Sequence, residues 1–113
     1  MSEVFFDYQQ AIERLDGDEE FLRELLYELV EQVDESWSGF EEAISSKDHE
    51  TLRRLAHSIK GAAANLNVDK MAELFAILES LGRSESFEGV EEYIEQIREL
   101  NESLRSYLNE SSN

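Results

Sequence analysis

The sequence predicts an all-α protein: an antiparallel up-down four-helix bundle with a short extra helix at its N-terminal end. Three observations favour this fold class. The 113 residues include no proline and only five glycines, so few positions interrupt a helix. Apolar residues recur at steps of three and four along most of the chain, whereas the alternation typical of a half-buried strand is not found. Short polar connections separate the apolar stretches, which makes successive helices antiparallel neighbours.

The first two predicted helices are separated by Asp16-Gly17-Asp18. A short helix is expected over residues 7–15. Asp16 or Asp18 can cap a long second helix, which we expect to continue to about Ser46. Gly39 weakens this helix by about 1 kcal/mol relative to alanine, but the periodicity continues on both sides of it. The apolar positions of the second helix are Leu22, Leu26, Leu29, Val33, Trp37, Phe40 and Ile44.

Three further helices complete the predicted bundle. Asp48 is the expected N-cap of the third helix, which should end near Asn67, because asparagine tolerates the left-handed conformation that closes many helices. The fourth helix is expected over Asp69 to Leu81. A polar loop over residues 82–86 follows, and the last helix is expected over Phe87 to Leu108, with a frayed end beyond it.

The third predicted helix presents one histidine to solvent. At about 100° per residue its apolar side chains share one broad face, and His57 points nearly the opposite way. Arg53, Lys60, Gly61 and Ala64 lie around His57 on this outer face, which combines positive charge with little side-chain bulk. The pattern indicates a docking surface around a reactive imidazole. The core-facing residues are Leu52, Leu55, Ala56, Ile59, Ala62, Ala63 and Leu66.

The net charge of −17 argues against two classes of partner. A chain this acidic repels phosphate backbones and anionic bilayers, so neither nucleic-acid binding nor membrane binding is expected. The charge is also unevenly distributed. The window from Lys47 to Lys70 carries five basic and three acidic residues, for a net charge of +2, which leaves −19 on the rest of the chain. Positive charge therefore gathers around the exposed histidine.

Length and composition indicate one domain over residues 1–113. Hydrophobic residues make up 41% of the chain, which suffices for a single core. No apolar run is long enough to cross a bilayer, and the N-terminal residues lack the pattern of a signal peptide. We therefore expect a cytoplasmic location, and we expect a monomer.

Several kinds of chemistry can be excluded by spacing. The chain has two histidines, no cysteine and no Glu-x-x-His pair, so no metal site is expected. No glycine-rich phosphate loop is present, and no cofactor is expected. His57 on a convex helix face provides no pocket for a hydrolytic triad. What remains is His57 as a nucleophile, because neutral imidazole has a free lone pair. Lys60, one turn away, can supply positive charge to a transferring phosphoryl group.

The run Ala56-His57-Ser58-Ile59-Lys60-Gly61-Ala62-Ala63 resembles the core motif of histidine-containing phosphotransfer (HPt) domains, roughly Ala-His-x-Leu/Ile-Lys-Gly-Ala/Ser-Ala/Ser. Residues 15–22 look like the usual entry to the family's long second helix, and residues 47–56 look like its approach to the histidine. The resemblance covers most of the chain and is dense from about residue 48 to residue 79. It implies a four-helix bundle whose exposed histidine is phosphorylated in a multistep two-component phosphorelay.

The resemblance also implies roles for individual residues. By this matching His57 is the phosphorylated residue, Lys60 assists electrostatically and Gly61 provides clearance. Glu79 falls where the family often has glutamine or glutamate near the histidine. Asn67 stands where the family commonly has glycine, a departure that a helix end tolerates.

The resemblance further implies the partners. They would be response-regulator receiver domains and a histidine kinase, with Mg²⁺ bound by the receiver rather than by this chain. The chain itself would be a phosphocarrier without a kinase site. Arg53 and Arg54 are candidates for contact with acidic partner surfaces, and Ala64 is a candidate for clearance.

Two alternatives remain open from the sequence. The chain could be the phosphoacceptor domain of a larger histidine kinase, in which case ATP would be the phosphoryl donor. It could instead be a helical adaptor that binds a partner without covalent chemistry.

Overall fold

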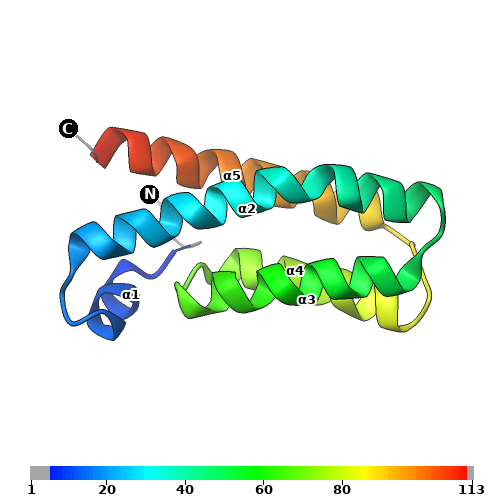
Figure 1. Cartoon of the computed structure of the whole chain (residues 1–113), viewed down its shortest axis with the longest axis horizontal. Coiled ribbons are helices and arrows are strands. Elements are labelled where there is room, and N and C mark those ends of the chain that lie inside the picture. The colour runs from blue at the N-terminus through cyan, green and yellow to red at the C-terminus, as the bar shows by residue number, and fades with distance from the viewer. Residues whose placement is uncertain (1–5, 112–113) are drawn as a thin grey trace.

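The computed structural model describes residues 6–111, which form five helices and no strand. The four longer helices run alternately up and down and pack as a ring, in which each helix contacts two others (Figure 1). The shortest helix lies across one end of this bundle. The predicted fold class is therefore confirmed. The helices are α1 (Tyr8–Arg14), α2 (Glu19–Ser45), α3 (His49–Asn65), α4 (Asp69–Arg83) and α5 (Val90–Ser111).

Aspartate side chains cap the N-termini of the first three helices. The carboxylate of Asp7 accepts a hydrogen bond from the backbone N–H of residue 10, that of Asp18 from residue 21, and that of Asp48 from residue 51, at 3.0–3.1 Å. The predicted cap at Asp48 is confirmed. The N-cap of α2 is Asp18 rather than Asp16, because Asp16 has a φ of +55° and belongs to the preceding turn.

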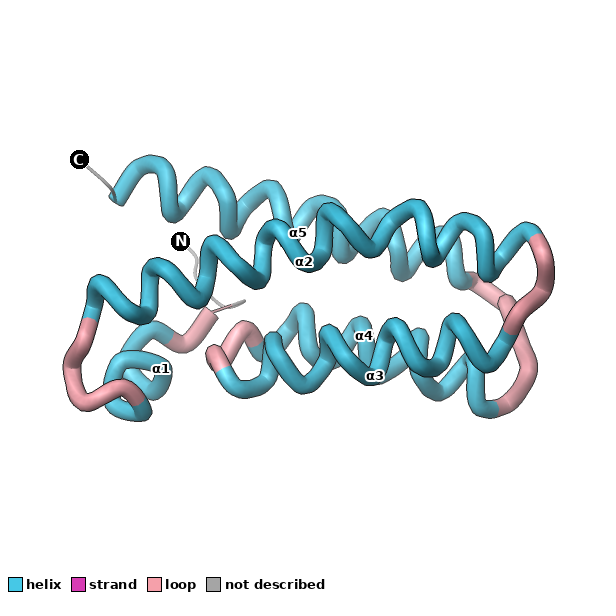
Figure 2. Tube along the Cα trace, viewed as in Figure 1, coloured by secondary structure: helices cyan, strands magenta, loops and turns pink. Residues whose placement is uncertain are grey.

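Left-handed residues close the short connections between helices (Figure 2). Asn67 has a φ of +60°, as the sequence predicted for the end of α3. Its backbone carbonyl accepts a hydrogen bond from the N–H of Asp7, and its side-chain amide donates to Gln10. These bonds hold α1 against the turn between α3 and α4. Lys47 and Glu85 take the same conformation at the ends of α2 and α4, which the sequence did not indicate.

Three predicted boundaries are wrong. The fourth helix ends at Arg83 rather than Leu81, because Gly82 is buried against α3 and continues the helix instead of stopping it. The last helix begins at Val90 rather than Phe87, because Gly89, with a φ of +74°, breaks helical geometry just before it. This helix also continues beyond Leu108 to Ser111.

The core runs the length of the bundle and fixes the orientation of α3. Ala56, Ile59 and the other buried side chains of α3 face α4 and the bundle interior, as periodicity predicted. Leu55 and Ala62 are half-buried at the edge of this face. The phenyl rings of Phe40 and Phe75 stack across the centre, with centroids 6.1 Å apart. His57 is thereby left on the outer surface.

Within residues 6–111, no helix combines the length and apolarity needed to cross a bilayer.

Candidate functional site

His57 lies in the middle of α3, and its side chain is 63% exposed. Its neighbours one residue before and two residues after, Ala56 and Ile59, are buried in the core. Because these two residues point about 100° and 200° around the helix from His57, packing of their side chains turns the imidazole outward. The sequence-based orientation of His57 agrees with the structure.

A buried carboxylate on α4 contacts the imidazole. Glu79 is 3% exposed, and its Oε2 atom lies 2.9 Å from Nδ1 of His57. The Nζ atom of Lys60 lies 2.7 Å from Oε1 of the same carboxylate. Arg83, one turn further along α4, places Nη2 at 2.8 Å from Oε2. One carboxylate therefore holds the imidazole and two cations together.

Glu79 is ionised at neutral pH. The hydrogen bond from Lys60 lowers the pKa of the Glu79 carboxyl to about 2, with a further contribution from His57, and together they outweigh the opposing effect of burial. An ionised carboxylate only accepts hydrogen bonds. Nδ1 of His57 must therefore carry the proton in the contact with Glu79.

This contact determines which ring nitrogen is free to react. With the proton held on Nδ1, the lone pair of neutral His57 resides on Nε2. The exposed imidazole can thus present an unprotonated nitrogen to an incoming electrophile. The ammonium of Lys60 and the guanidinium of Arg83 bind the same carboxylate that contacts the ring.

Gly61 and Ala64 are both exposed next to His57 on α3. A Cβ atom added at Gly61 would meet no heavy atom within 4 Å, so packing within this chain does not require glycine there. These two positions add little side-chain bulk to the outer face of α3, as the sequence predicted.

Neither Arg53 nor Arg54 enters the hydrogen-bond network around Glu79. The guanidinium of Arg53 binds Glu50 through Nε at 3.2 Å and Nη2 at 2.6 Å, and this pairing raises the pKa of Arg53. Arg54 is exposed on the same helix. Both residues flank the site without contacting its carboxylate in the part of the chain that the structure describes.

Sequence reasoning missed Arg83 because it was assigned to a polar loop. The available signal was its spacing: an arginine four residues after a glutamate can pair with it if the helix continues that far.

The other histidine, His49, has a different environment. Its ring stacks on Phe87 with centroids 4.4 Å apart.

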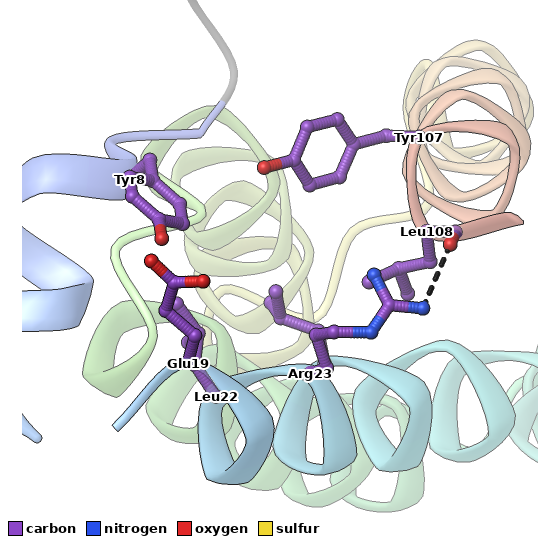
Figure 3. Close-up of a pocket in the computed structure, with 7 residues that line it drawn as sticks. Tyr8, Glu19, Leu22, Arg23, Tyr107 and Leu108 are labelled. Atoms are coloured by element: carbon purple, nitrogen blue, oxygen red, sulfur yellow. Dashed lines mark hydrogen bonds between the residues drawn. The ribbon is translucent and has the colours of Figure 1, made fainter. Parts of the chain in front are cut away.

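A small hollow of about 160 Å³ lies among α1, α2 and α5 (Figure 3). Arg23 donates a hydrogen bond to the carbonyl of Leu108 at 2.9 Å, and the hydroxyl of Tyr107 points into the hollow. A hydrogen bond to Glu19 raises the pKa of Tyr8. No residue of α3 or α4 lines this hollow, so it is separate from the surface around His57.

Among residues 6–111, no cluster of three or more histidine, aspartate or glutamate side chains is arranged to hold a metal ion.

Comparison with known proteins identifies relatives over most of the chain. A sequence model described as the Hpt domain matches residues 24–107. Multistep phosphorelay regulator 1 of Schizosaccharomyces pombe is 30% identical over 84 residues, which cover 74% of this chain. The chain spans only 28% of the length of that relative. The crystal structure of histidine-containing phosphotransfer protein B from Pseudomonas aeruginosa PAO1 superposes with a TM-score of 0.86. It is 23% identical, and the match covers 97% of this chain and 96% of that one, so it shows a shared fold.

Proposed function

Because this chain belongs to the Hpt domain family, we propose that it is a histidine phosphotransfer protein of a multistep two-component phosphorelay. His57 accepts a phosphoryl group from the aspartate of one receiver domain and passes it to another. The observation that carries the proposal is the contact between His57 and Glu79. In the neutral ring this contact holds the proton on Nδ1 and leaves the lone pair on Nε2, and the same carboxylate binds two cations.

The transfer step needs no general base on this chain. The lone pair of Nε2 attacks phosphorus, and an N–P bond forms as the P–O bond of the aspartyl phosphate breaks. The aspartate leaves as a carboxylate. The ring gains positive charge, which the ionised Glu79 stabilises through the proton on Nδ1.

Lys60 and Arg83 supply positive charge where phosphoryl oxygens arrive. Phosphoryl transfer depends chiefly on positioning and on neutralising the charge of these oxygens. Both cations are anchored to Glu79, the carboxylate that contacts Nδ1 of His57, in the unphosphorylated protein. Each retains further N–H donors that can turn to the phosphoryl group.

The proposal extends to partners and location. The partners are response-regulator receiver domains and a histidine kinase, and the Mg²⁺ ion is bound by the receiver. This chain acts as a phosphocarrier rather than as an enzyme with its own kinase site. A cytoplasmic location is part of the proposal. The small side chains at Gly61 and Ala64 let the receiver approach closely, and Arg53 and Arg54 flank the contact.

A transfer assay tests the function. The purified chain is mixed with a receiver domain carrying labelled phosphate on aspartate, in the presence of Mg²⁺, and label on this chain is followed. We expect label that is acid-labile and base-stable, and that is absent from the His57→Gln variant.

His49→Gln is the matched control, because His49 is the other histidine of the chain and lies outside the site. It should accept phosphate normally. Label on the His57→Gln variant would refute the assignment of the residue. No label on the wild type across a panel of receivers would refute transfer from receivers. It would favour phosphorylation by an ATP-dependent kinase domain, or a helical adaptor without covalent chemistry.

A further inference from the structure

At Gly82 the backbones of α3 and α4 lie closer together than a side chain at this position would allow. A Cβ atom built at Gly82 would lie 2.8 Å from the backbone N of Arg53 and 2.8 Å from the carbonyl oxygen of His49. Both atoms belong to the α3 backbone, so neither can rotate away as a side chain would. An ordinary contact begins at about 3.4 Å. To bring a larger residue to an ordinary contact distance, the helices would have to separate by about 0.6 Å.

This close approach lies directly beside the site. Gly82 follows Glu79 by three residues on α4, and Arg53 precedes His57 by four residues on α3, so each pair is about one helical turn apart. The contact between Gly82 and Arg53 is thus one turn away from the hydrogen bond between Glu79 and His57. If the helices separate at Gly82 and Arg53, the distance between Glu79 and His57 should therefore increase as well.

The contacts of Glu79 have little room for such a displacement. The distance from Nδ1 of His57 to Oε2 is 2.9 Å, and a separation of 0.6 Å would lengthen it to the limit of a hydrogen bond. The Glu79 side chain is only 4% exposed, so its conformation is restricted by packing. It is also held by Lys60 and Arg83.

We propose that Gly82 is a positioning residue, whose missing side chain brings α4 close enough to α3 for Glu79 to hold the proton of His57 on Nδ1. The inference deepens the function proposed above and rests on it for its effect on transfer. Its effect on the imidazole can be measured without any phosphate.

The test is the tautomer of His57 in the full chain with Gly82→Ala, read from two-bond ¹H–¹⁵N NMR correlations of the ring nitrogens. In the wild type we expect Nδ1 to be protonated in the neutral ring. In the variant the hydrogen bond to the charged carboxylate is weakened, and we expect the ratio of Nδ1–H to Nε2–H tautomers to fall by roughly tenfold. The rate of phosphate acceptance should fall in parallel.

Gly39→Ala is the matched control. Gly39 also lies inside a helix, but its added Cβ would meet Cδ1 of Leu55 at 3.1 Å, the movable end of a side chain. This variant should retain the wild-type tautomer ratio. Glu79→Asp withdraws the carboxylate by one methylene group with no atom added between the helices, and it should reproduce the shift expected of Gly82→Ala.

A folded Gly82→Ala variant with the wild-type tautomer ratio would overturn the proposal. So would a Gly82→Ala chain that no longer folds, because Gly82 would then serve the whole bundle rather than one carboxylate. A wild type with the proton on Nδ1 that accepts no phosphate would refute the proposed function and leave the role of Gly82 standing.

Discussion

The Nδ1 atom of His57 lies 2.9 Å from Oε2 of Glu79, a carboxylate that is almost fully buried beneath an imidazole that is mostly exposed. The two residues are 22 positions apart in the chain and meet because α3 and α4 are antiparallel neighbours. In the proposed function the exposed residue provides the reactive atom. The buried residue determines which nitrogen carries the proton.

Removing the carboxylate should therefore slow phosphate acceptance while His57 remains in place. In Glu79→Ala the proton is no longer held on Nδ1, and the positive charge that develops on the ring loses its counter-charge. A hydrogen bond to a charged group contributes about 1.5–3 kcal/mol, so we expect a rate roughly ten- to a hundredfold lower. The measurement is single-turnover transfer from a phosphorylated receiver domain.

Glu73→Ala is the control for this loss, because Glu73 is an exposed glutamate of the same helix. It should transfer at the wild-type rate. Equal rates for Glu79→Ala and the wild type would mean that the contact with His57 has no part in the reaction.

The same carboxylate predicts how stability depends on pH. Because folding lowers the pKa of Glu79 from 4.5 to about 2, its contribution is fully present above about pH 4.5. It is lost as pH falls from about 4.5 toward 2, where the folded form also takes up a proton. The contribution is at most about 3 kcal/mol in the free energy of unfolding.

Urea denaturation of the wild type and Glu79→Gln at a series of pH values measures this contribution. We expect the wild type to be more stable at pH 6 and the difference to shrink steadily below about pH 4.5. A difference that stays constant down to pH 2 would contradict the lowered pKa of Glu79.

The two cations should contribute unequally to transfer. The Lys60 side chain is 33% exposed and that of Arg83 is 64% exposed, so solvent screens Arg83 more strongly. We expect Lys60→Ala to lower the transfer rate by about tenfold and Arg83→Ala by less. Rates measured at low and high salt would test this, because added salt should diminish the effect of Arg83→Ala first. A larger loss of transfer rate in Arg83→Ala than in Lys60→Ala would contradict this order of contributions.

Periodicity and local chemistry were enough to predict the orientation of His57. The apolar positions of α3 determine its buried face, so the opposite face follows from helix geometry alone. The cap at Asp48 and the left-handed Asn67 follow equally from local preferences of aspartate and asparagine. These features depend on residues close together in the chain.

The environment of Glu79 could not be predicted in this way. Whether a glutamate on a helix flank is solvated or buried depends on how near the next helix lies, and that distance is a tertiary property. Gly82 illustrates the difficulty. A glycine near the end of a periodic stretch is typical of a helix stop, yet here it continues α4 because it packs against the backbone of α3. Arg83 was lost from the predicted site for the same reason.

A buried asparagine between α2 and α5 provides a final prediction about the fold. Asn101 is 2% exposed, and its amide donates to the carbonyl of Val30 at 3.3 Å and to the carboxylate of Asp34 at 3.1 Å. Its own Oδ1 atom has no hydrogen-bond partner among the described residues. A buried acceptor without a partner is unfavourable, and Asp34 keeps a second partner in Arg105.

Asn101→Leu should therefore stabilise the bundle, by about 1 kcal/mol in the free energy of unfolding, because it buries apolar surface and removes the unpaired oxygen. Asn101→Asp should destabilise it by about 3 kcal/mol or more, since it would bury a second carboxylate beside Asp34. Urea denaturation of both variants at pH 7 measures the two effects. Destabilisation by Asn101→Leu as large as that by Asn101→Asp would show that the hydrogen bonds of Asn101 hold α2 and α5 together more strongly than apolar packing could.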